Sequence, residues 1–174
     1  MQAQGSARQM QPAPEQPVKV RIGGLTDEIK GTFETIGRRA FDIFERKGRA
    51  LGHALTDWLE AEAEFLHPVR LELLESDESY RIRAEVPGFS VRELDVRIEP
   101  QRVTITGSRE TAEEKQIMKR VYSEWSSNRI LRTIELPAEV NTESAKATLK
   151  DGILELDLLK ATPGKRVPIE TRTA

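Results

Sequence analysis

The sequence predicts an all-β domain of the immunoglobulin-like antiparallel β-sandwich class, preceded by an α-helical region and flanked by flexible extensions. Between residues 68 and 160, apolar and polar residues alternate in short runs separated by turn residues. This pattern is typical of half-buried strands in a sandwich. Between residues 25 and 67, apolar residues recur every three or four positions, which is the period of amphipathic helices.

The composition limits the function classes. The chain has 174 residues, a formal net charge of -2 and no cysteine. This charge gives no reason to expect nucleic acid or an acidic membrane as a partner. The lack of cysteine excludes disulfides and thiolate chemistry. The sequence shows neither a signal peptide nor an apolar run of transmembrane length, so we expect a cytoplasmic protein.

The N-terminal part divides into an arm and two helices. Residues 1–24 contain several prolines and few large apolar side chains, which predicts a disordered arm. The region 25–67 is predicted to be helical. Its first helix has Asp27 in the first turn and Gly48 as its stop. The second helix starts near Thr56 or Asp57 and ends before Pro68.

The apolar faces of these helices allow two interpretations. They could pack as a helical hairpin, on each other or on a second copy, or they could bind unfolded chains. The candidates for client binding are the large apolar residues of both helices. They are Phe33, Ile36, Phe41, Phe44, Trp58 and Phe65.

The predicted domain covers residues 68–160. Alternating runs begin at Val69, Tyr80, Leu94 and Val103, and a less regular run precedes Leu136. The last two strands are expected to form a hairpin. They are residues 145–149 and 154–158, joined through Asp151-Gly152, because glycine accepts a positive φ at such a turn.

Two further segments indicate contacts between subunits. Residues 109–119 form a long charged excursion followed by strand-like Val121-Tyr122. A loop that carries its own strand can pair with a neighbouring subunit. The C-terminal extension, 161–174, carries the apolar residues Val167 and Ile169 around Pro168. They share one face of an extended backbone, which indicates docking onto another surface.

Catalytic motifs are missing from the sequence. His53 and His67 are the only histidines, and without cysteine they make a zinc site improbable. There is no Gly-x-Ser-x-Gly elbow. The acidic pairs Asp77-Glu78 and Glu113-Glu114 lie in polar loops, where solvated carboxylates are the usual finding. We therefore expect no enzyme, no cofactor and no metal.

Four motifs, in this order, resemble the small heat-shock proteins of the Hsp20 or α-crystallin family, in their bacterial form. They are Val86-Pro87-Gly88-Phe89, Ile134-Glu135-Leu136-Pro137, Ala147-x4-Gly152-Ile153-Leu154 and Val167-Pro168-Ile169. The third motif contains the hallmark of the family's domain, and the fourth matches the family's tail motif. The helical region around Arg39-Ala40-Phe41 and Asp57-Trp58-Leu59 is similar to bacterial segments of unassigned function.

The resemblance implies an ATP-independent holdase that captures partly unfolded clients and keeps them from aggregating. It implies dimers that exchange a strand of the long loop, with Lys115, Ile117, Met118, Arg120 and Tyr122 as candidates. It also implies a groove of a neighbouring subunit that accepts the tail. The groove residues would be Leu94, Val96 and Ile98 on one strand and Ala145, Ala147 and Leu149 on another.

The expected partners are therefore further copies of the chain, forming dimers and larger homo-oligomers, and unfolded client proteins. Two other functions stay open. One is a p23-like adaptor that binds a single folded partner and needs no tail motif. The other is a structural assembly protein whose helical face is used up between subunits.

Overall fold

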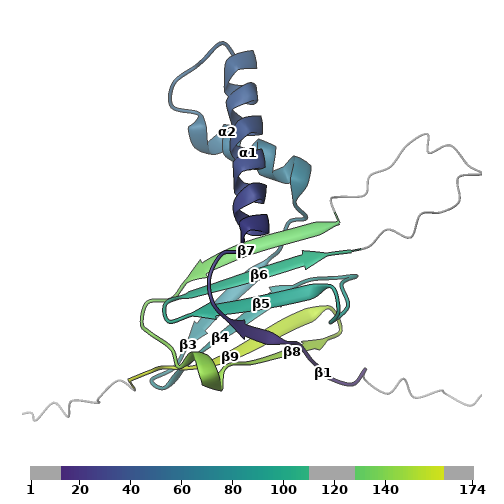
Figure 1. The fold of residues 1–174 in the computed structure, drawn as a ribbon, viewed down its shortest axis with the longest axis vertical. Coiled ribbons are helices and arrows are strands. Elements are labelled where there is room, and N and C mark those ends of the chain that lie inside the picture. Colours follow the sequence, from purple (N-terminus) through teal and green to yellow (C-terminus); the bar gives the residue numbers. More distant parts are fainter. Residues whose placement is uncertain (1–12, 110–127, 163–174) are drawn as a thin grey trace, which may run out of the picture.

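The computed structural model describes residues 13–109 and 128–162, which form a two-layer β-sandwich with a helical hairpin beside one sheet (Figure 1). The elements in chain order are β1 (Gln16–Pro17), β2 (Val20–Ile22), α1 (Asp27–Arg46), α2 (Ala54–Phe65), β3 (Leu71–Glu75), β4 (Ser79–Glu85), β5 (Leu94–Glu99), β6 (Arg102–Ser108), β7 (Arg129–Glu135), the 3-10 turn η1 (Thr142–Ser144), β8 (Lys146–Lys150) and β9 (Ile153–Leu159). Neither described helix is both long and apolar enough to cross a membrane.

The predicted sandwich is confirmed. One sheet has the strand order β1-β8-β9-β4-β3 and the other the order β2-β5-β6-β7. All neighbouring strands are antiparallel except β2 and β5, which are parallel. The inward positions of each strand meet in one core, as the alternation in the sequence predicts. Its fully buried side chains include Tyr80, Ile82, Val96, Ile105, Leu154 and Leu156.

The predicted turn between the last two strands is also confirmed. Lys150 pairs with Ile153, so Asp151 and Gly152 are the only residues of the loop. Their φ angles are +50° and +76°, and a type I′ turn requires positive φ at both positions. Gly152 also lies against the Pro87 backbone, which brings two of the sequence motifs into contact.

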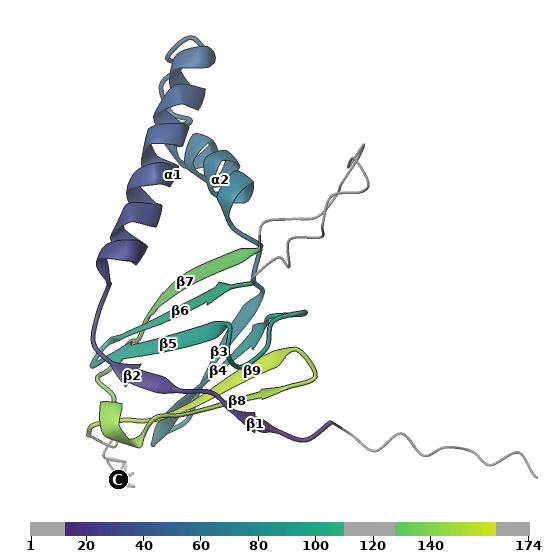
Figure 2. The ribbon, with the colours of Figure 1, turned by 45° about the vertical axis from the view of Figure 1, so that its right-hand side comes forward.

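The two helices form a hairpin that meets the sandwich at β7 (Figure 2). Thr26 caps α1, and its hydroxyl accepts a hydrogen bond from the Ile29 amide at 3.4 Å. Leu131 of β7 joins the apolar cluster between the helices. The His67 amide donates to the Arg129 carbonyl at 2.7 Å. The helical region is thus attached to the edge of the four-stranded sheet.

The expectation of disorder over residues 1–24 is wrong for residues 13–24. This stretch contains β1, which pairs with β8, and β2, which pairs with β5. Val18 between them is buried and belongs to the core of the sandwich. The segment carries few apolar side chains, but it obtains main-chain partners from strands far away in the sequence. Composition alone does not reveal such partners.

Gly152 and Gly31 allow a matched test of the turn. We expect Gly152→Ala to lower the free energy of unfolding by about 1 kcal/mol or more, since alanine disfavours positive φ. Gly31 lies inside α1, and a Cβ there would meet no other atom within 4 Å. Gly31→Ala should therefore raise stability by up to about 1 kcal/mol. Urea unfolding of both variants measures the two effects, and equal effects of the same sign would contradict this account.

Candidate assembly groove and client-binding surface

The residues predicted to accept the tail lie together along one side of the sandwich. Leu94, Val96 and Ile98 come from β5, and Ala147 and Leu149 from β8. All five are buried in the core of the sandwich, and Ala145 packs against that core. The structure therefore brings the two strands of the predicted groove to the same seam between the sheets. We refer to this seam between β5 and β8 as the β5–β8 groove.

The groove is not open in the described chain, because residues 16–22 lie along it. β1 extends the edge of β8, with Pro17 opposite Thr148. β2 extends the edge of β5, with Val20 opposite Val96. Figure 2 shows this N-terminal segment passing from one sheet to the other. An open groove would require β5 and β8 to be edge strands, and in the described residues neither of them is.

The main chain of this segment is hydrogen-bonded between and beyond its two strands. The Val18 amide donates to the Ala147 carbonyl at 2.9 Å, and the Gly23 amide donates to the Ile98 carbonyl at 3.0 Å. The Val18 side chain is only 5% exposed, and Val20 packs against the core. The segment thus combines strand pairing with the burial of apolar side chains.

Charged side chains flank the segment. Arg21 lies 3.2 Å from Asp95 on β5, and Glu15 lies 3.6 Å from Lys150 on β8. These pairs are largely solvent-exposed, and exposed pairs contribute little stability. They therefore favour the observed register of the strand pairing and add little to its stability.

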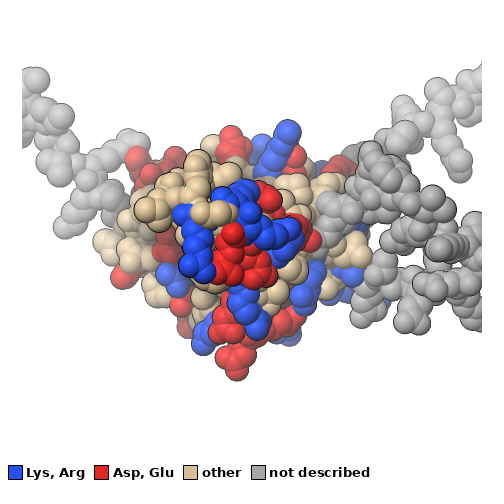
Figure 3. Space-filling view, turned by 90° about the horizontal axis from the view of Figure 1, so that it is seen from above, with Lys and Arg blue, Asp and Glu red and all other residues tan. Residues whose placement is uncertain are grey.

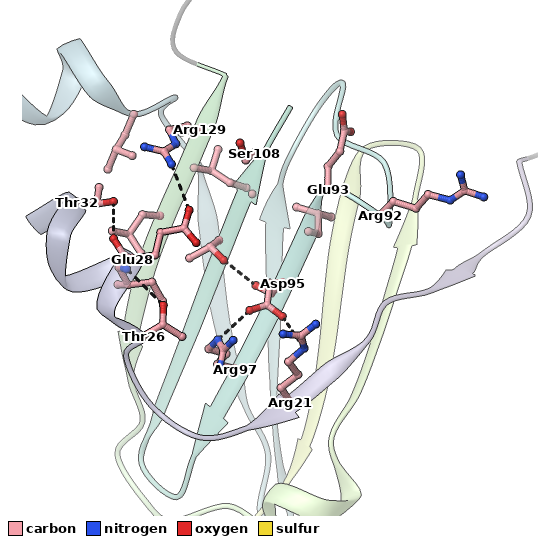
Figure 4. Close-up of a pocket in the computed structure, with 17 residues that line it drawn as sticks. Arg21, Thr26, Glu28, Thr32, Arg92, Glu93, Asp95, Arg97, Ser108 and Arg129 are labelled. Atoms are coloured by element: carbon pink, nitrogen blue, oxygen red, sulfur yellow. Dashed lines mark hydrogen bonds and ion pairs between the residues drawn. The ribbon is translucent and has the colours of Figure 1, made fainter. Parts of the chain in front are cut away.

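A pocket of about 380 Å³ lies between the start of α1 and the outer face of the β5–β6–β7 sheet (Figure 4). Most of its charged residues pair with one another. Asp95 bridges Arg21 and Arg97, and Glu28 contacts Arg129 at 3.2 Å. Within residues 13–109 and 128–162 no cluster of three potential metal ligands occurs. The pocket is therefore a polar seam between the helical and strand regions, with no arrangement of groups that suggests catalysis.

The predicted client-binding residues differ in how much of each side chain is exposed. Ile36 is 1% exposed at the centre of the helical cluster, so its assignment to a client surface is wrong. Phe33 and Trp58 stack with their ring centroids 6.5 Å apart. These two rings, together with Phe44 and Phe65, are half-buried. Among the predicted residues, only Phe41 is largely exposed, at 56%.

Three leucines outside the predicted client-binding set are also largely exposed. Leu51, Leu55 and Leu59 are 88%, 71% and 54% exposed. Their four-residue spacing is visible in the sequence. The inward face of α2 instead carries Asp57 and Ala61. With Phe41, these leucines form the set that we call the exposed hairpin residues.

The inward face of α2 carries a buried carboxylate with a cation as its partner. Asp57 is 2% exposed, and its Oδ1 accepts a hydrogen bond from Lys47 Nζ at 2.9 Å. Lys47 also donates to Glu60 at 2.8 Å. The bonds to Glu60 and Asp57 raise the pKa of the Lys47 ammonium. A buried carboxylate requires such a partner, and Lys47 supplies it from the end of α1.

A second ion pair joins the helices further along. Arg39 donates to Glu64 with two nitrogens, at 2.6 and 2.8 Å. The hydrogen bond from Arg39 lowers the pKa of the Glu64 carboxyl. Seen from the helical end of the molecule, acidic and basic side chains alternate without a large area of one sign (Figure 3). The hairpin is thus held by apolar contacts inside and by paired charges outside.

The Lys47–Asp57 contact leads to a test of the hairpin. We expect Lys47→Met to destabilise the helices, because it leaves the buried Asp57 carboxylate without its cation. Lys30→Met is the matched control, since Lys30 lies 3.8 Å from the fully exposed Asp27. Thermal unfolding followed by circular dichroism should show an earlier helical transition for Lys47→Met alone. Identical transitions in both variants would show that the buried contact does not support the hairpin.

Comparisons with known proteins identify two regions of the chain. The model of the Hsp20/alpha crystallin family matches residues 72–171, more than half of the chain. The model of a protein family of unknown function (DUF2934) matches residues 33–66, which cover most of the helical hairpin. The family boundary therefore falls close to the structural boundary between hairpin and sandwich.

Individual relatives agree with the first match. Small heat shock protein C2 of Rickettsia felis is 29% identical over 103 residues, which are 59% of this chain and 67% of the relative. The 22.0 kDa heat shock protein of Arabidopsis thaliana is 33% identical, over 58% of this chain and 52% of the relative. The chain thus spans between half and two thirds of the length of these relatives. Heat shock protein 16.0 of Schizosaccharomyces pombe shares the fold, with a TM-score of 0.50 and 21% identity over 60% of this chain and 99% of that chain.

Proposed function

The chain belongs to the Hsp20/alpha crystallin family, and from this premise we propose that it is a holdase. Proteins of this family are generally ATP-independent chaperones and not enzymes. The proposed activity is the capture of partly unfolded proteins on apolar surface, which keeps them from aggregating under stress. The observation that carries the proposal is the set of exposed hairpin residues, Phe41, Leu51, Leu55 and Leu59.

These side chains suit weak and adaptable capture. Each is more than half exposed, so a client can cover it without displacing core residues. Apolar side chains that are exposed together in a patch mark interaction sites, whereas single exposed apolar residues are common on any surface. The same hairpin also carries exposed charged pairs, such as Arg39–Glu64. The site therefore has no fixed pocket that would restrict it to one folded ligand.

The proposal includes assembly in two steps. The first is a dimer in which the loop segment 115–122, outside the described residues, pairs with a neighbour. The outer edge of β3 supports this step. β3 is the last strand of its sheet in the described chain, and its Leu74 is 43% exposed. Such an edge can accept a strand from another subunit.

The second step is the docking of the tail. Val167, Pro168 and Ile169 also lie outside the described residues, and their proposed acceptor is the β5–β8 groove of a neighbour. Two small apolar side chains contribute a few kcal/mol at about 25 cal/mol per Å² of buried surface, before ordering costs. Each contact is therefore weak and reversible. A stable particle requires many of them at once.

Heating a labile enzyme without ATP tests the holdase activity. We expect the protein to suppress light scattering at near-equal molar ratios. The triple variant Phe41→Ser, Leu55→Ser, Leu59→Ser should need a several-fold excess for the same suppression. Asp42→Ser changes an exposed polar residue of α1 and should behave as the unchanged chain. If the unchanged protein fails to suppress aggregation even in excess, the holdase proposal is wrong, and an adaptor or structural assembly protein is favoured.

Mass measurement tests the tail. The double variant Val167→Ser, Ile169→Ser removes both apolar anchors and should reduce the particle to dimers in multi-angle light scattering. Thr171→Ser serves as the control, because it leaves the anchors in place. An unchanged mass for the double variant would exclude the proposed docking of the tail.

A further inference from the structure

Residues 16–22 and the C-terminal tail carry the same recognition pattern. Val18-Lys19-Val20 and Val167-Pro168-Ile169 each place two branched apolar side chains one residue apart. On an extended backbone such residues point to the same side. In the first segment this side faces the sandwich, since Val18 is buried, Val20 packs on the core and Lys19 between them is exposed.

The first segment also uses the main-chain groups that a docked strand would need. β1 pairs with β8 and β2 pairs with β5. The Val18 amide donates a hydrogen bond to the Ala147 carbonyl, and the Gly23 amide donates one to the Ile98 carbonyl. The free side of a strand can pair with only one further strand. Another segment cannot dock along β5 and β8 while residues 16–22 remain there.

We propose that residues 16–22 are a built-in competitor of the C-terminal tail, so that a neighbour's tail docks in the β5–β8 groove only after this segment leaves. The inference rests on the tail docking proposed above and adds a mechanism that regulates this docking. Because the segment belongs to the same chain, it competes at a high effective concentration. Assembly through the tail then depends on how often the groove is vacant, and not only on the affinity of the tail.

Competition has a quantitative consequence. The apparent dissociation constant of the tail equals its intrinsic value divided by the fraction of chains with a vacant groove. A segment that occupies the groove in about nine chains of ten weakens tail binding about tenfold. Removing its two valines should restore the intrinsic affinity.

A labelled synthetic peptide of residues 161–174 is the probe. The protein is the full chain with Val167→Ser and Ile169→Ser, so that its own tail does not interfere. We expect the further changes Val18→Ser and Val20→Ser to tighten peptide binding about tenfold or more in fluorescence polarisation. Lys19→Ser is the matched control, because the Lys19 side chain points away from the core, and it should leave the affinity unchanged.

A disulfide lock provides a second variant that keeps the valines. Pro17 is directly opposite Thr148, and the Cα atoms of opposite residues in an antiparallel pair lie about 4.5–5.5 Å apart, a distance that a disulfide can bridge. The chain has no cysteine, so Pro17→Cys with Thr148→Cys creates the only pair. The oxidised protein should not bind the peptide, and reduction should restore binding.

The outcomes separate this inference from tail docking itself. Tighter binding to the valine variant, together with loss of binding in the oxidised lock, supports the competition. If the peptide binds all proteins equally, the competition is excluded while tail docking stands. If the peptide binds none of them, including the valine variant and the reduced lock, tail docking and its competitor are both excluded.

Discussion

The unpaired edges of its two sheets are the constraint on which the organisation of this protein depends. A sandwich, unlike a closed barrel, leaves main-chain donors and acceptors open at the end of every sheet. Without residues 16–22, β5 and β8 would present such edges on the same side of the core, and this segment pairs with both. The edge of β3 stays without a partner among the described residues. The protein therefore has one side that its own chain covers and another that it leaves available.

The helical hairpin is stabilised in a different way. Its apolar interface is small, and ion pairs between the two helices add to it. Ile36 and Ile43 fill the space between the helices, but the inward face of α2 also carries Asp57. Lys47 makes this burial tolerable. With a carboxylate on the inside, Leu55 and Leu59 turn outward. The exposed leucines that we propose for clients thus lie on the face of α2 opposite the one that carries Asp57 and Ala61.

Local patterns in the sequence predict most of the sandwich, whereas contacts between distant parts of the chain cannot be read from it. The alternation around Tyr80, Val96 and Leu156 and the Asp151-Gly152 turn are local signals, and both predicted the structure correctly. Residues 18–22 carry the same alternation, Val18-Lys19-Val20-Arg21-Ile22, but the proline-rich composition around them predicted disorder, and their partners on β5 and β8 lie far along the chain. The orientation of α2 was missed for a related reason. The periodicity of its leucines is real, but the buried face of α2 is the one that carries Asp57 and Ala61, and the partner of Asp57, Lys47, lies outside the helix.

The groove and the hairpin are not independent, because only residues 23–26 separate β2 from α1. This connection is tight. Gly24 lies so close to Glu99 that a Cβ at this position would be 2.7 Å from the carboxylate oxygen, and Thr26 already caps the helix. The other end of the hairpin is fixed to β7 through His67 and Leu131. The start of α1 also contacts β7 through the Glu28–Arg129 pair. The proposed release of residues 16–22 would therefore loosen one of several attachments of the hairpin, which links the edge of the sandwich to the surface proposed to meet clients.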